Sequence, residues 1–125
     1  MKLNVFNSKL EDCLILKSEK FEDERGSFIR AFDYEILKKY LKGFNISAIN
    51  ISETKKKGTL RGLHFQKYPF QEIKIIRCIR GKIFDVAVDL RKNSKSFLKH
   101  ETIILEEGDN KAFVIPEGCA HGFQT

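Results

Sequence analysis

Short runs of alternating apolar residues, separated by turn signals, constrain the fold of this chain most strongly. The runs cover residues 44–52, 72–79, 82–90, 100–105 and 111–115. They are rich in β-branched and aromatic side chains, and Gly81 offers a turn between two of them. The glycine-containing connection at residues 106–110 predicts a hairpin. Short strands at regular spacing predict an all-β sandwich or jelly-roll barrel.

One segment predicts a helix instead of a strand. Asp33 can cap it, Glu35 favours its first turn and Gly43 can end it. The apolar residues expected on one face are Ile36, Leu37, Tyr40 and Leu41. We therefore expect an all-β domain with one short helix.

Size and composition indicate a single domain spanning residues 1–125, with a net charge of +6 that favours an anionic partner. No nucleic-acid-binding motif accompanies that charge. No apolar run approaches the ~20 residues that a membrane helix needs, and no leader pattern opens the chain. The three cysteines lack metal-type spacing and are expected to be reduced. These features predict a cytoplasmic protein that binds neither nucleic acid nor membrane.

Two charged residues occupy unusual positions in the expected strands. Asp85 shares a face with Ile83 and Ala87, so it points either into a cavity or into solvent. Lys74 shares a side with Ile76, so its ammonium either reaches out to water or has a function.

Two motifs carry residues suited to proton transfer, LRGLHFQ at residues 60–66 and PEGCAHGF at residues 116–123. A base beside a fixed cation can remove a proton next to a carbonyl group. In a straight strand Arg61 and His64 would face opposite sides. A shared site therefore requires a twist or bulge, which Gly62 is suited to provide.

These motifs, together with FEDERGSF at residues 21–28 and DVAVDLR at residues 85–91, resemble the dTDP-4-dehydrorhamnose 3,5-epimerase family. The resemblance runs from about Phe21 to the last residue, with the four motifs in order. It implies a cupin-type jelly-roll barrel that needs no metal or cofactor. It also implies epimerisation of a dTDP-4-keto-6-deoxyhexose in the synthesis of deoxysugars such as rhamnose, for surface polysaccharide.

The resemblance assigns four catalytic positions. It implies that His64 is the base, that Lys74 and Arg61 steady the enolate, and that His121 shapes or polarises the same pocket.

The resemblance also assigns substrate-binding positions. Arg25 would pair with the diphosphate, Phe28 would pack near the base, and Asn50 and Gln66 would lie in the pocket. In the family the residues at positions 25 and 28 reach into the neighbouring subunit, which implies a homodimer.

The chain departs from the family pattern at three places. Arg30 stands where many members have glutamate, and Ala48 where many have glutamine, so the preferred sugar or nucleotide can differ. Members also continue well beyond the second histidine motif, and that part holds a tyrosine taken as the general acid and an aspartate that orients the catalytic histidine. We expect a C-terminally short form or fragment with impaired epimerisation, in which Asp85 is a possible substitute orienter, for His121.

Two other classes of protein are the alternatives. The first is a non-catalytic sugar-nucleotide-binding cupin. The second is a metal-dependent cupin enzyme, which the spacing of Gly58 before His64 and the second motif would fit. Metal cupins carry another histidine where Gln66 stands, and Lys74 would add positive charge to a metal site. We therefore expect no metal.

Overall fold

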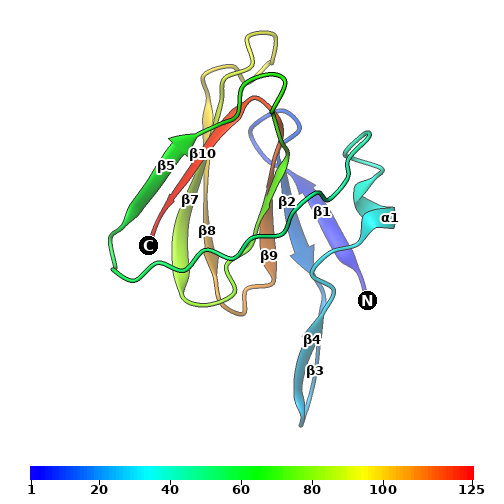
Figure 1. Cartoon of the computed structure of the whole chain (residues 1–125). Helices are drawn as coiled ribbons and strands as arrows, with labels where there is room; N and C mark the ends of the chain where they lie inside the picture. The colour runs from blue at the N-terminus through cyan, green and yellow to red at the C-terminus, as the bar shows by residue number, and fades with distance from the viewer.

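The computed structural model describes residues 1–125 and consists of two four-stranded antiparallel sheets, one two-stranded hairpin and one short helix (Figure 1). The first sheet has the order β1 (Leu3–Asn7), β2 (Leu14–Ser18), β9 (Lys111–Ile115) and β6 (Lys74–Ile76). The second sheet has the order β5 (Leu60–His64), β10 (Cys119–Gln124), β7 (Lys82–Asp89) and β8 (His100–Glu106). The hairpin is formed by β3 (Lys20–Asp23) and β4 (Gly26–Ile29), and the helix is α1 (Tyr34–Leu37). The all-β prediction is confirmed.

The connection at residues 106–110 is not the predicted hairpin, although the strands on both sides of it are confirmed. β8 pairs with β7 in the second sheet, whereas β9 pairs with β2 and β6 in the first. The Asp109 carboxylate accepts hydrogen bonds from the backbone N–H groups of Glu106 and Lys111, at 3.0 and 2.9 Å. These hydrogen bonds give the backbone N–H groups of the turn a partner although β8 and β9 are not hydrogen-bonded to each other. The chain can therefore cross from one sheet to the other.

The prediction of a strand at residues 44–52 is wrong, and the predicted strand at residues 72–79 shortens to β6. Residues 45–56 run without regular structure from the helix region toward β5 (Figure 1). Ile49 and Ile51 are 84% and 81% exposed. The β-branched residues have the right local preference here, but the segment pairs with no strand of either sheet.

The helix begins where the sequence predicts and ends after one turn. Asp33 accepts a hydrogen bond from the Ile36 N–H at 3.1 Å, and Gly43 has the left-handed φ of +65° that suits a stop. Leu37 and Leu41 are buried as expected. Tyr40 is 52% exposed, contrary to the prediction, because the residues after Leu37 form turns and do not keep the helical spacing.

Two apolar clusters hold the layers together. The cluster between the sheets contains Leu10, Cys13, Ala87, Leu105, Phe113, Ile115 and Cys119. The cluster between the first sheet and the helix contains Leu3, Leu14, Leu16, Leu37, Leu41, Ala112 and Val114. All three cysteines are free, and burial raises the pKa of the Cys119 thiol to about 11. No helix has the length and apolar character required to cross a bilayer.

A buried carboxylate fastens the end of β7 to the loop that follows it. The Asp89 side chain is fully shielded from solvent and accepts hydrogen bonds from Arg91 Nε at 2.9 Å and Ser96 Oγ at 2.6 Å. Burial by itself raises the pKa of Asp89, but the hydrogen bonds from Arg91, Ser94 and Ser96 outweigh it and hold that pKa well below its usual range.

Replacing Asp89 with alanine is expected to lower the free energy of unfolding by about 3–5 kcal/mol, because it leaves the Arg91 charge without its buried partner and Ser96 Oγ without its acceptor. The measurement is urea unfolding at pH 7 followed by circular dichroism. Asp12→Ala is the matched control, since its 70% exposed side chain contacts the same arginine and its loss should cost no more than about 1 kcal/mol. An equal loss in the two variants would contradict the assignment.

The stabilisation of the folded state by the Asp89 carboxylate is expected to depend on pH. The folded state holds this carboxyl at a lower pKa than the unfolded chain, where aspartate titrates near ~3.9. The stabilisation is therefore complete above that pH and is lost as the pH falls below it. The difference in unfolding free energy between the wild type and Asp89→Ala should shrink below about pH 4.

Candidate active site between the two sheets

The two motif histidines lie side by side on neighbouring strands. His64 at the end of β5 is directly opposite His121 in β10, and their ring centroids are 6.2 Å apart in an edge-on arrangement. His121 is also opposite Ala87 of β7, which belongs to the cluster between the sheets. Directly opposed residues share a face of an antiparallel sheet. Both histidines therefore lie on the inter-sheet face, meaning the face of each sheet that looks toward the other.

His121 is fixed by a carboxylate on the next strand. Its Nε2 lies 2.5 Å from Asp85 Oδ1, and the side chains of His121 and Asp85 are 4% and 0% exposed. The other Asp85 oxygen, Oδ2, is buried without a hydrogen-bond partner. The sequence left two orientations open for Asp85, and the structure places it on the inter-sheet face. An ionised carboxylate accepts a hydrogen bond from the imidazole N–H, which fixes the orientation of the His121 ring.

A bulge in β5 brings Arg61 onto the same face as His64, as the sequence predicted. Arg61 is opposite Phe123 and His64 is opposite His121, so β5 uses one more residue than β10 between these two pairs. Gly62 lies within the bulge with a φ of +94°, and a Cβ atom there would be 2.5 Å from the backbone oxygen of His121. A side chain at position 62 would therefore separate the two histidine strands.

The Arg61 guanidinium extends toward the irregular segment before β5. Its Nη2 donates to the Glu53 carbonyl oxygen at 3.1 Å, and its Nε donates to Thr54 Oγ1 at 3.3 Å. Asn50 lies on the same segment and is exposed. Arg61 thus connects this segment to the strand that carries His64.

Lys74 approaches from the opposite sheet. It is paired with Ile115 of β9, whose side chain belongs to the inter-sheet cluster, so Lys74 also lies on the inter-sheet face. Its side chain is 16% exposed, and its Nζ lies 3.0 Å from Glu72 Oε1. Sequence reasoning gave Glu72 no role, yet the two-residue spacing on an extended strand already puts it beside Lys74.

The predicted nucleotide-binding residues lie elsewhere in this chain. Arg25 and Phe28 belong to the β3–β4 hairpin, which projects away from both sheets (Figure 1). Arg25 is paired with Asp23 at 2.6 Å, and Phe28, opposite Phe21, is 62% exposed. Gln66 is exposed in the loop after β5. In one copy of the chain, His64, Arg61 and His121 lie together on the second sheet and Lys74 lies on the inter-sheet face of the first sheet, whereas the hairpin residues lie apart from both sheets.

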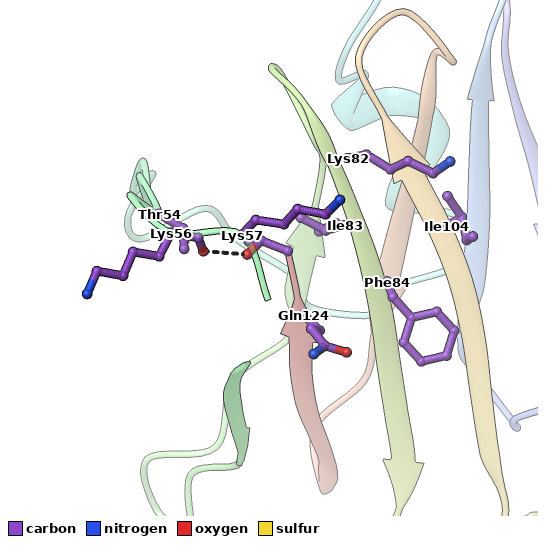
Figure 2. Close-up of a pocket in the computed structure, with 9 residues that line it drawn as sticks. Thr54, Lys56, Lys57, Lys82, Ile83, Phe84, Ile104 and Gln124 are labelled. Carbon is purple, nitrogen blue, oxygen red and sulfur yellow. Dashed lines mark hydrogen bonds between the residues drawn. The ribbon is translucent and has the colours of Figure 1, made fainter. Parts of the chain in front are cut away.

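Neither of two surface cavities contains the histidines. A cavity of about 570 Å³ is lined by Lys56, Lys57, Phe84, Ile104 and Gln124, among others (Figure 2). Phe84 and Ile104 face each other across β7 and β8, on the side away from the core, and each is 45% exposed. A second cavity, of about 270 Å³, lies against the hairpin beside Arg25 and Phe28. His64, His121 and Lys74 instead lie on the inter-sheet faces of their sheets, so these faces, and not the two cavities, form the candidate site.

No group of three or more histidine, cysteine, aspartate or glutamate side chains is arranged to hold a metal ion. The reactive groups are instead two imidazoles, one partnered carboxylate and two cations. Such a set can remove a proton from carbon and stabilise the oxyanion that results.

The fold is a cupin-like jelly roll, and these side chains form a candidate acid–base site on its inter-sheet face. Comparison with known protein families identifies the family. The family model described as dTDP-4-dehydrorhamnose 3,5-epimerase matches residues 7–125 of this chain. The chain belongs to the dTDP-4-dehydrorhamnose 3,5-epimerase family, as the sequence motifs indicated.

Individual relatives agree with this assignment. The Escherichia coli (strain K12) dTDP-4-dehydrorhamnose 3,5-epimerase is 39% identical over 97% of this chain and 65% of its own length. The crystal structure of the Elizabethkingia anophelis NUHP1 enzyme superposes with a TM-score of 0.89 at 38% identity, covering 98% of this chain and 67% of that one. The Bacillus anthracis enzyme, with TDP and PPi bound, has a TM-score of 0.89 at 36% identity, covering 99% and 71%. The chain spans about two thirds of the length of the relatives it matches.

Proposed function

We propose that this protein binds a dTDP-4-keto-6-deoxyhexose and exchanges the protons on the carbons next to the ketone, as a 3,5-epimerase. The observation that carries the proposal is the placement of the His64–His121 pair on the inter-sheet face of one sheet and of Lys74 on the inter-sheet face of the other. A relative from Legionella pneumophila, 31% identical with a TM-score of 0.82, was crystallised with dTDP-4-keto-L-rhamnose.

Each group has a separate task in this reaction. His64 takes the proton from the carbon beside the ketone, because imidazole is well suited to proton transfer near neutral pH. Lys74 and Arg61 stabilise the negative charge that develops on the ketone oxygen. His121, fixed by Asp85, shapes the pocket beside His64 and polarises the bound substrate. Return of a proton from solvent water to the opposite face of the ring neutralises the enolate and inverts the carbon.

The hairpin completes the site of a second copy in this proposal. Phe21 and Phe28 form an exposed cross-strand pair, at 56% and 62%, beside the Arg25 guanidinium. An aromatic pair next to an arginine suits a nucleotide, whose base can stack and whose diphosphate can accept from the guanidinium. The proposed homodimer therefore holds the nucleotide with one subunit's hairpin and the sugar with the other subunit's sheets. Asn50 and Gln66 are proposed to line the same pocket.

The remaining parts of the proposal concern cellular role. We assign the protein to cytoplasmic deoxysugar synthesis, such as that of rhamnose for surface polysaccharide, without a metal or cofactor. The support for this role is membership of the family.

The direct test is proton NMR of dTDP-4-keto-6-deoxyglucose with the protein in deuterated water. We expect the signals of the protons on the two carbons flanking the ketone to disappear as deuterium replaces these protons. The control dTDP-glucose, which has no ketone, should keep all its proton signals. Binding of the keto sugar without any exchange would make the protein a non-catalytic sugar-nucleotide-binding cupin. Activity abolished by a chelator and restored by a metal would point to a metal-dependent enzyme instead.

Replacing Arg25 with alanine is expected to weaken dTDP binding about 10- to 100-fold, because hydrogen bonds from a charged donor to phosphate are worth roughly 1.5–3 kcal/mol. Isothermal titration calorimetry with dTDP measures the effect. Arg80→Ala is the control, since Arg80 is an exposed arginine paired with Glu53. Unchanged affinity in Arg25→Ala would remove this residue from the site.

Mixed dimers test whether the hairpin acts across subunits. When Arg25→Ala and His64→Ala subunits are combined, one site of each hybrid dimer receives an intact hairpin and an intact base. Activity is therefore expected to rise above that of either variant alone. Mixtures that stay as inactive as the parents would contradict the crossed arrangement.

A further inference from the structure

Glu72 and Lys74 form an ion pair that belongs to the candidate active site. Glu72, Lys74 and Ile76 alternate along one side of an extended segment, and Ile76 packs against the cluster between the sheets. Ile73 and Ile75, on the other side, pack against the cluster beneath the helix. The Glu72 carboxylate is therefore directed to the side of the sheet that carries the Lys74 ammonium.

The two partners of this pair differ strongly in exposure. The Lys74 side chain is 16% exposed and its single ion pair is the 3.0 Å contact with Glu72, whose side chain is 54% exposed. The ammonium thus lies in the partly shielded space between the sheets, and the carboxylate lies at the edge of that space. An ammonium has three N–H donors, so the contact with Glu72 leaves the others free for a ligand oxygen.

We propose that Glu72 is a positioning residue that acts through Lys74, holding the ammonium on the inter-sheet face while its negative charge weakens the attraction of Lys74 for an anionic oxygen. This inference rests on the proposed function. The oxyanion forms only after the proton has left the carbon, so the opposing charge of Glu72 raises the barrier to the reaction more than it weakens binding of the neutral ketone.

Glu72→Gln tests this charge, because it keeps an oxygen acceptor of the same length and removes the negative charge. We expect kcat for proton exchange to rise roughly three- to tenfold with little change in KM, the size expected for one partly screened charge at this separation. Glu72→Ala, which also removes the acceptor that holds the ammonium, should be slower than Glu72→Gln. Glu106→Gln removes a similar exposed carboxylate beside Lys82 and should leave both constants unchanged.

A double variant shows whether the effect passes through Lys74. In a Lys74→Met background, Glu72→Gln should change kcat by less than a factor of two, because no ammonium remains for the carboxylate to oppose. The same rise in both backgrounds, or no rise in the wild-type background, would overturn the inference while leaving the proposed function intact.

A second measurement is independent of catalysis. The ¹⁵N-ammonium NMR signal of Lys74, assigned by its loss in Lys74→Met, should shift in Glu72→Gln and remain in place in Glu106→Gln. If the wild type exchanges no substrate protons, the proposed function fails. The Lys74 ammonium signal then tests only whether Glu72 and Lys74 form an ion pair. An ammonium signal that does not respond to Glu72→Gln would overturn the pairing itself.

Discussion

Replacing His64 with alanine is expected to lower the rate of proton exchange by about 10²- to 10⁴-fold, the usual contribution of a positioned general base. Binding of dTDP should change little, because His64 is assigned to the sugar ring and not to the nucleotide. Exchange is measured by NMR in deuterated water, and binding by calorimetry on the same samples.

His100→Ala is the matched control for His64→Ala. His100 starts β8 and is exposed, with no part in the inter-sheet face, so its removal should leave exchange unchanged. Exchange at the wild-type rate in His64→Ala would show that another group removes the proton. His121 would then be the group to test, since it is the other imidazole on that face.

Lys74→Met is expected to lower kcat by about 10²- to 10³-fold, the usual cost of removing one donor to a developing oxyanion. Methionine matches the length of the lysine stem and suits the apolar surroundings between the sheets, so thermal stability should be kept. Steady-state kinetics should place the loss in kcat, because the charge that Lys74 stabilises is absent from the ground state.

Lys82→Met is the corresponding control, since Lys82 lies on the edge of the cavity away from the histidines. A loss confined to KM in Lys74→Met would show that Lys74 binds the substrate and does not stabilise the oxyanion.

Residue alternation predicted the parts of this molecule that depend on a single strand. A period of two put Asp85 on one face with Ile83 and Ala87, and Lys74 on one side with Ile76, but left open whether these sides face the core. The bulge followed from the need to turn Arg61 and His64 to one side. The motif order supplied the family, and through it the candidate site residues.

Features that depend on which strands become neighbours were not predictable in the same way. Residues 106–110 have the composition of a hairpin turn, yet the Asp109 hydrogen bonds serve a crossing between layers equally well. Residues 44–52 have strand propensity but pair with no strand in this chain. The pairing of Glu72 with Lys74, by contrast, agrees with simple alternation, because residues two positions apart on an extended strand share a side.

The pairing of β5 with β10 also bears on how the molecule is made. β5 is an edge strand whose residues are all exposed, and its single neighbour in the sheet is β10, the last strand of this sequence. During synthesis β5 therefore leaves the ribosome well before its partner exists, and contacts between such distant segments form slowly. The strand that carries His64 must remain soluble through this interval. Its central Arg61-Gly62 pair serves that need, because a charge and a glycine discourage pairing with the strands of other nascent chains.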